Sequence, residues 1–188
     1  MMKDRDQPET ESPSGTVPVI TLDGPGGCGK GAVSRLVALR LGWHFLDSGA
    51  LYRLVGMAAR KLGVNLDNHK EISKIAEKLD VVFKSNSDGS GVQIYLQGLD
   101  VSDDIRSEQS ASDASIVAAI PDVRLALLSR QRAFLQSPGL VADGRDMGSV
   151  VFPDSQLKIF LTASQQERAN RRYKQLKDKG MEIGRAHV

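Results

Sequence analysis

The chain has 188 residues, of which 40% are hydrophobic and 26% are charged, and its formal net charge is +2. These values are typical of one globular domain, and the near balance of charge argues against nonspecific binding to nucleic acid or membranes. A single cysteine excludes an intramolecular disulfide and suits a reducing compartment. Because we find neither an apolar run of about 20 residues nor a secretory signal, we expect a cytoplasmic protein.

The first elements surround a glycine-rich loop. Residues 1–16 are polar and contain several prolines and serines, so we expect a disordered leader. An apolar run over residues 17–22 predicts a buried strand, and residues 32–41 carry apolar side chains at helical spacing. A strand, a glycine-rich loop ending in Gly-Lys and a helix, in this order, are typical of a phosphate-binding loop.

The loop consists of Gly24, Pro25, Gly26, Gly27, Cys28, Gly29, Lys30 and Gly31. Its glycines let backbone N–H groups point at phosphate oxygens, and the helix N-terminus adds partial positive charge. Lys30 would reach the β- and γ-phosphates. The usual pattern has Ser or Thr directly after the lysine, where this chain has Gly31. With no evident His partner, Cys28 is interpreted as a small residue that the loop tolerates rather than as a catalytic thiol.

The rest of the chain alternates between strands and helices. We predict strands at residues 43–46, 140–143 and 157–161, and helices at 50–62, 71–79, 107–119, 122–135 and 165–179. Residues 80–101 instead predict a small antiparallel unit, which either shapes a substrate site or is a decorative hairpin. The alternation predicts an α/β fold with a parallel central sheet, in which ligands gather at the carboxyl ends of the strands.

Polar residues follow two of these strands. Asp143 ends one of them, where a carboxylate can bind Mg²⁺ directly or through water, although a turn aspartate is the alternative. Arg145, just beyond, is interpreted as a phosphate ligand, because guanidinium binds phosphate bidentately. Asp47 and Ser48 end the other strand, and Arg53 follows one helical turn later. Arg53 fits either a second anion clamp or a solvated helix face.

The helix at 165–179 is strongly basic. Arg168, Arg171 and Arg172 share one of its faces. A solvated helix, arginines that close over phosphates and an RNA-binding stripe are all compatible with this pattern, but the near-zero net charge argues against RNA. His44, His69 and His187 are too scattered to suggest a metal site or a triad.

Several motifs carry a resemblance to a known family. They are Asp23-Gly24-Pro25 with the Gly-Lys-Gly loop, residues 46–53 (LDSGALYR), residues 141–148 (VADGRDMG), residues 115–119 (SIVAA) with Pro121 and Arg124, and residues 130–134 (RQRAF). Together, from about Val17 to about Gly180, they resemble bacterial cytidylate kinase, a nucleoside-monophosphate kinase of the P-loop class. The resemblance implies a three-layer P-loop fold, with residues 80–101 as an insertion that enlarges the CMP-binding side.

The resemblance also implies the reaction and its residues. ATP, with Mg²⁺, would phosphorylate CMP or dCMP in pyrimidine nucleotide metabolism, and the Mg²⁺ would arrive with ATP rather than on a set of protein ligands. Residues 24–32 would bind ATP, and the implied catalytic residues are Lys30, Asp143, Arg145, Arg168 and Arg172. The implied acceptor-binding residues are Asp47, Ser48, Tyr52, Arg53, Ser115, Arg124, Arg145 and Asp146. A monomer that binds neither nucleic acid polymer nor membrane is expected.

Within that acceptor group, Arg53 and Arg145 would hold the phosphate of CMP. Ser115, Arg124 and Asp146 would read the cytosine edge, because a carboxylate accepts from the N4 amino group that uracil lacks, and an arginine donates to N3 or O2. A nucleotide switch that only hydrolyses its ligand would not need such residues around a second nucleotide. This difference favours the kinase over the switch.

Two departures from the family pattern stand out. The family has Thr after Gly-Lys-Gly, whereas this chain has Ala32, so we expect weaker Mg²⁺–ATP binding. The family also continues well past Gly180, with further lid arginines and a fifth strand. Residues 183–188 match a translated frame of a sequencing adapter and are expected to be a non-native tail. A kinase domain at 17–182 without its C-terminal part would be poorly stable and nearly inactive.

Overall fold

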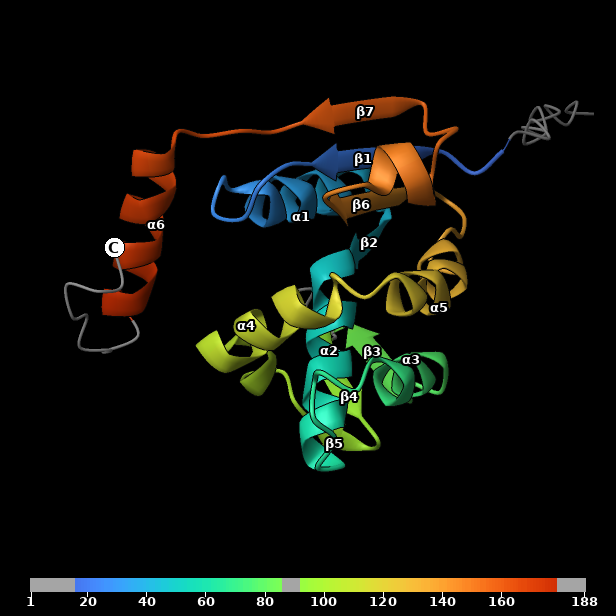
Figure 1. Ribbon diagram of the computed structural model, residues 1–188. Helices are drawn as coiled ribbons and strands as arrows, with labels where there is room; N and C mark the ends of the chain where they lie inside the picture. The colour runs from blue at the N-terminus through green and yellow to red at the C-terminus, as the bar shows by residue number, and fades with distance from the viewer. Residues whose placement is uncertain (1–15, 86–91, 179–188) are drawn as a thin grey trace, which may run out of the picture.

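The computed structural model describes residues 16–85 and 92–178 (Figure 1). The elements are β1 (Val19–Asp23), α1 (Lys30–Leu41), β2 (His44–Asp47), α2 (Ser48–Lys61), α3 (His69–Glu77), β3 (Val81–Ser85), β4 (Val92–Leu96), β5 (Leu99–Asp100), a 3₁₀ turn (Asp104–Arg106), α4 (Glu108–Val117), α5 (Pro121–Arg132), β6 (Leu140–Gly144), a π-helical turn (Met147–Val151), β7 (Leu157–Phe160) and α6 (Gln165–Asp178). Every predicted helix and strand is present. Residues 1–15 of the expected leader at 1–16 and the expected tail at 183–188 lie outside the described residues, and the domain boundaries at 17 and 182 stay predictions.

The central sheet is parallel and has the strand order β2-β6-β1-β7. All five residues of β6 are buried, as expected for a strand covered on both faces. In the register of the sheet, Asp47 of β2 is opposite Asp143 of β6, and Asp23 of β1 is opposite Gly144. The predicted α/β fold is therefore confirmed, and the three strand ends that carry the candidate residues lie side by side.

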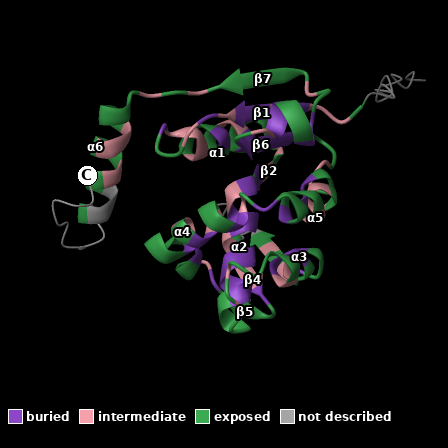
Figure 2. Ribbon diagram, viewed as in Figure 1, coloured by how far each residue is buried: buried purple, intermediate pink, exposed green. Residues whose placement is uncertain are grey.

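Helix α2 connects the sheet to a second unit. It runs from β2 into the lower half of the molecule, where α3, α4 and α5 surround it (Figure 1). Ten of the 14 residues of α2 are buried, so this helix is the core of the unit (Figure 2). The predicted antiparallel insertion is the three-stranded sheet β3-β4-β5. The ring of Phe83 in β3 packs edge-on against Phe134, just after α5, with 5.5 Å between ring centroids.

The opposite side of the sheet is more open. All four residues of β7 are exposed, and α6 stands apart from the sheet at the end of an extended segment (Figures 1 and 2). Leu36 and Leu39 of α1 are also exposed, at 57% and 69%. Among the described residues, no helix has the length and apolar character needed to cross a membrane.

Candidate active site

The loop between β1 and α1 has a backbone that only glycine tolerates at its start. Gly24 has φ +144°, and a Cβ there would lie 2.0 Å from the carbonyl oxygen of Leu161. The N–H of Leu161 in turn donates to the carbonyl of Asp23 at 2.8 Å, which ties β1 to the segment after β7. The first turn of α1 contains no acidic residue, so the partial positive charge of its N-terminus is available to an anion.

Lys30 and Asp143 lie together beneath this loop. The Lys30 Nζ donates to the carbonyl of Pro25 at 3.0 Å and is 3.9 Å from the Asp143 Oδ1, and both side chains are about nine-tenths buried. Burial, together with the charge of Asp47, raises the pKa of Asp143 to about 7, although Lys30 and Arg35 oppose the rise. The negative charge of Asp143 is therefore incompletely compensated by the residues around it.

The carboxylate of Asp143 also explains why glycine follows Lys30. A Cβ at Gly31 would lie 3.3 Å from the Asp143 Oδ2, so a side chain at this position would press on Asp143. Ala32 is exposed, whereas the hydroxyl of Ser34 is fully buried and has no hydrogen-bond partner among the described residues. Ser34 therefore does not replace the hydroxyl that the family carries at position 32.

Asp23 has a role that sequence reasoning missed. Its two carboxylate oxygens accept hydrogen bonds from the backbone N–H groups of Met147 and Gly148, at 2.8 and 2.9 Å. These bonds fix the backbone directly after Arg145 and Asp146. They therefore also fix the directions in which these two side chains point. The sequence motif Asp23-Gly24-Pro25 contains this residue, but only the fold shows that its partner is Met147, 124 residues away.

The acceptor side begins where β2 meets α2. Asp47 is the N-cap of α2, where its Oδ1 accepts from the N–H of Ala50 at 3.2 Å. Ser48 is buried against β6, since a Cβ on Gly144 would lie 2.6 Å from its Oγ. Arg53 donates from Nη1 to the carbonyl of Ile105 at 3.0 Å. Arg145 is exposed, and its Nη2 is 4.0 Å from the position of a Cβ on Gly26, so it faces the loop.

A close ion pair between Arg124 and Asp146 joins α5 to the end of β6. With Tyr52, these two residues line a small cavity of about 170 Å³. Burial raises the pKa of Tyr52, whereas the charge of Arg124 works in the opposite direction. Ser115 lies instead on an exposed part of α4, where its hydroxyl donates to the carbonyl of Ala111 at 3.1 Å. The structure thus brings Tyr52, Arg124 and Asp146 together but does not bring Ser115 to this cavity.

The basic helix α6 reaches the loop through Arg171. Its Nη1 donates to the carbonyl of Cys28 at 2.8 Å, and its Nε donates to Glu167 at 2.6 Å. Arg168 packs beside Gly27, and its Nε is buried with no hydrogen-bond partner among the described residues. Arg172 forms an ion pair with Glu108 of α4, and burial together with the charge of Arg53 lowers its pKa. Sequence spacing placed these arginines on one face, but it could not show that Arg171 is the one that donates a hydrogen bond to the loop.

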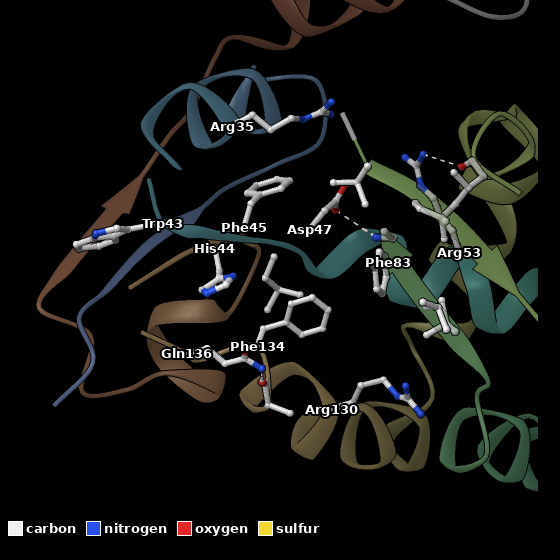
Figure 3. A pocket seen from close by; sticks show the side chains of 18 of the residues that line it. Arg35, Trp43, His44, Phe45, Asp47, Arg53, Phe83, Arg130, Phe134 and Gln136 are labelled. Atoms are coloured by element: carbon white, nitrogen blue, oxygen red, sulfur yellow. Dashed lines mark hydrogen bonds between the residues drawn. The ribbon is translucent and has the colours of Figure 1, made fainter. Parts of the chain in front are cut away.

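A larger cavity, of about 690 Å³, lies between the outer edge of β2, the antiparallel insertion and the end of α5 (Figure 3). Phe45, Phe83 and Phe134 line this cavity, and Asp47 lies between Phe45 and Arg53 in the view of Figure 3. The insertion therefore helps to form a cavity that reaches acceptor-side residues. This arrangement favours a substrate-shaping role over a decorative hairpin.

A glycine-rich loop ending in Gly-Lys lies between the first strand and the first helix of a parallel sheet, with Arg145 and the α6 arginines Arg168 and Arg171 beside it. This arrangement is typical of a P-loop nucleotide-binding protein. The family model described as "Cytidylate kinase" matches residues 20–188. The chain is 60% identical to a cytidylate kinase of Stutzerimonas stutzeri, over 92% of this chain and 75% of the relative. It is 56% identical to one of Shewanella denitrificans, over 88% and 73%, and 58% identical to one of Pseudomonas aeruginosa, over 90% and 74%.

The chain therefore belongs to the cytidylate kinase family. Its activity is that of a nucleoside-monophosphate kinase, the phosphorylation of CMP or dCMP by ATP. It spans about three quarters of the length of these relatives.

Proposed function

We propose that ATP and the acceptor nucleotide meet at the carboxyl end of β6, with the donor phosphates in the loop at 24–31 and the acceptor between α2 and α5. The observation that carries this proposal is that one strand end supplies residues to both sides. Asp143 pairs with Lys30 of the loop, and Asp146, three residues later, pairs with Arg124 of α5. A site for two nucleotides needs such a shared edge, because their phosphates must lie in line.

On the donor side, the backbone N–H groups of residues 24–32 would hold the β- and γ-phosphates, and Lys30 would neutralise their charge. Arg168 and Arg171 of α6 lie against the same loop. Arg172, next to Arg53, would face the transferred phosphoryl group from the acceptor side. The acceptor is already a phosphate anion, so no general base is required. Catalysis would consist of positioning and charge neutralisation.

On the acceptor side, Arg53 and Arg145 would bind the phosphate of CMP. Arg124 and Asp146 would read cytosine, with Asp47, Ser48 and Tyr52 shaping the remainder of the site. The buried setting of Tyr52 supports this assignment, because a ring in a small cavity offers a flat apolar wall to a base. Ser115 stays a prediction from the family resemblance, since its hydroxyl is bonded within α4.

The residues at the strand ends fit a Mg²⁺ ion that accompanies ATP. Carboxylate oxygens are the ligands that Mg²⁺ prefers, and the raised pKa of Asp143 marks a negative charge that a cation would compensate. Asp143, directly or through water, would hold the ion, which supplies charge neutralisation to the phosphates.

A monomer in the cytoplasm is proposed as the working form. The pairs Lys30–Asp143 and Arg124–Asp146 at the proposed site both form within one chain, without a second copy. Sedimentation at several protein concentrations, with and without ATP and CMP, would test the monomeric state.

The proposed function is tested by an assay of ATP with CMP, dCMP, UMP and AMP in turn, with ADP formation followed by a coupled reaction. We expect the turnover with CMP and dCMP to exceed the turnover with UMP and AMP. Replacing Arg124→Met should lower kcat/KM for CMP by at least about tenfold, because a charge-assisted hydrogen bond is lost, while KM for ATP stays near its wild-type value. The matched control is Arg40→Met, in the exposed last turn of α1.

Two results would argue for the other classes of protein. Phosphate release from ATP that does not depend on any acceptor would indicate a hydrolytic switch. RNA retention that weakens steeply with salt would indicate a nucleic-acid-binding role for α6. An equal fall of kcat/KM for ATP and CMP in Arg124→Met would refute the assignment of Arg124 to the acceptor.

A further inference from the structure

The π-helical turn that follows Arg145 and Asp146 is held at its end by a side chain from α5. The Arg132 Nε donates to the carbonyl of Val151 at 3.0 Å, and its Nη2 donates to the carbonyl of Val150 at 3.2 Å. These are the final two carbonyls of the turn, and the last carbonyls of a helical segment have no partner within it. Arginine suits this place because its planar fork presents several N–H donors in a fixed geometry.

The same two residues are bonded directly to Asp146. The backbone N–H groups of Val150 and Val151 both donate to the carbonyl of Asp146, at 2.9 and 3.3 Å. Each of the two valines therefore accepts a hydrogen bond from Arg132 and donates one to Asp146. Both valines also line the small cavity at which Asp146 lies. The guanidinium of Arg132 is thus linked to the cavity through two short paths of hydrogen bonds.

Helix α5 is attached to this segment at two places. Arg124, in its first turn, forms the ion pair with Asp146, and Arg132, its last residue, holds the end of the turn. The two arginines are eight residues apart, which is about 12 Å along the helix axis. Asp23 holds the start of the same turn. A turn held only at its start can pivot there, whereas one held at both ends fixes the direction of the Asp146 carboxylate. Arg132 is exposed, so packing in the core does not explain it.

We infer that Arg132 is a positioning residue for the acceptor base, and that through the end of the turn it holds the Asp146 carboxylate where this group accepts from the N4 amino group of cytosine. This inference rests on the proposed function, because it needs Asp146 to read the base. A carboxylate attracts an amino group and repels the carbonyl oxygen that uracil presents at the same place, and both effects weaken as the carboxylate moves away. Loss of Arg132 should therefore weaken the binding of CMP and relax the rejection of UMP.

The test compares the dissociation constants of CMP and UMP, measured by calorimetry on the wild type, Arg132→Met and Arg130→Met. Arg130 is the matched control, because it lies in the same helix and its Nη2 also donates to a backbone carbonyl, that of Leu79 after α3, at 2.6 Å. We expect Arg132→Met to lower the preference for CMP over UMP by at least about fivefold, since a displaced carboxylate loses much of its hydrogen bond to the base. Arg130→Met should leave the preference unchanged, because a purely structural effect weakens both ligands by the same factor.

The outcomes separate this inference from the proposed function. If the wild type binds CMP no better than UMP, the proposed function fails. If the wild type prefers CMP and Arg132→Met keeps that preference, or Arg130→Met lowers it equally, then Arg132 does not position the base-reading carboxylate. Arg132→Lys is a second variant, should the methionine variant not fold, because it keeps the positive charge and the apolar stem. Its single ammonium does not reproduce the fork, so its preference should also fall, and a wild-type preference in this variant would overturn the inference.

Discussion

Replacement of Asp143 by asparagine should stabilise the protein, and increasingly so as the pH rises. Burial and the nearby charge of Asp47 raise the pKa of this carboxyl from its ordinary value of 3.8 to about 7. The folded state therefore binds the proton more tightly than the unfolded chain does. The resulting stabilisation is fully present below about pH 4 and is lost as the pH rises toward 7.

The magnitude follows from the size of the rise in pKa. At about 1.4 kcal/mol per pKa unit, ionising Asp143 costs the folded state roughly 4 kcal/mol in total, of which about 3 kcal/mol falls between pH 5 and pH 8. Asparagine keeps the shape of the side chain and cannot ionise. The free energy of unfolding of Asp143→Asn should therefore exceed that of the wild type by a margin that grows by about 3 kcal/mol over this pH range.

The assay is urea denaturation followed by circular dichroism at half-unit pH steps from 5 to 8. Asp154→Asn, at an exposed aspartate before β7, is the control, and its pH profile should parallel that of the wild type. Taking the difference between the variant and the wild type cancels the titration of every group that both proteins share. A constant difference from pH 5 to pH 8 would show that Asp143 is ionised at low pH in the folded protein, and would refute the reasoning.

Three further changes test other parts of the site. Ala32→Thr should tighten Mg²⁺–ATP binding severalfold, because a hydroxyl returns to an exposed position at the mouth of the loop; equal affinities by equilibrium dialysis would contradict this. Asp23→Ala should lower the unfolding free energy by about 2 kcal/mol and raise KM for both CMP and ATP, because two N–H groups lose their acceptor and the chain after Asp146 is no longer held. Arg171→Met should speed hydrogen exchange in residues 165–178, because the bond to Cys28 ties α6 to the loop; unchanged exchange would rule out that bond as the tie.

Much of this architecture follows from local sequence patterns. The apolar strands, the helical spacing and the glycine-rich loop gave the order of the elements, since each pattern reflects interactions within about ten residues. The positions of Asp143 and Asp146 after an apolar strand were enough to assign them to the carboxyl edge of a parallel sheet. What could be predicted, therefore, was which residues share an edge of the sheet.

Contacts between distant segments could not be predicted in this way. The carboxylate of Asp23 meets Met147 and Gly148 only because β1 and β6 are neighbours in a particular register. Gly24 must be glycine because the carbonyl of Leu161, beyond β7, lies against it. Arg132 reaches the turn after β6 only because α5 packs against that turn. In each case the contact depends on how distant segments of the chain pack together, and local patterns in a single sequence do not determine that packing.

The end of β6 couples the two halves of the site. Asp143 faces the loop lysine, Arg145 faces the loop and Asp146 faces α5, and Asp23 holds the chain that follows them. A shift of this strand end would move donor-side and acceptor-side groups together. Substitutions that displace the backbone of residues 143–146 should therefore change ATP and CMP binding jointly. Substitutions at Lys30 or Arg124, which approach from opposite sides, should affect one nucleotide more than the other. Separate effects on the two nucleotides from changes at residues 143–146 would show that the halves are independent.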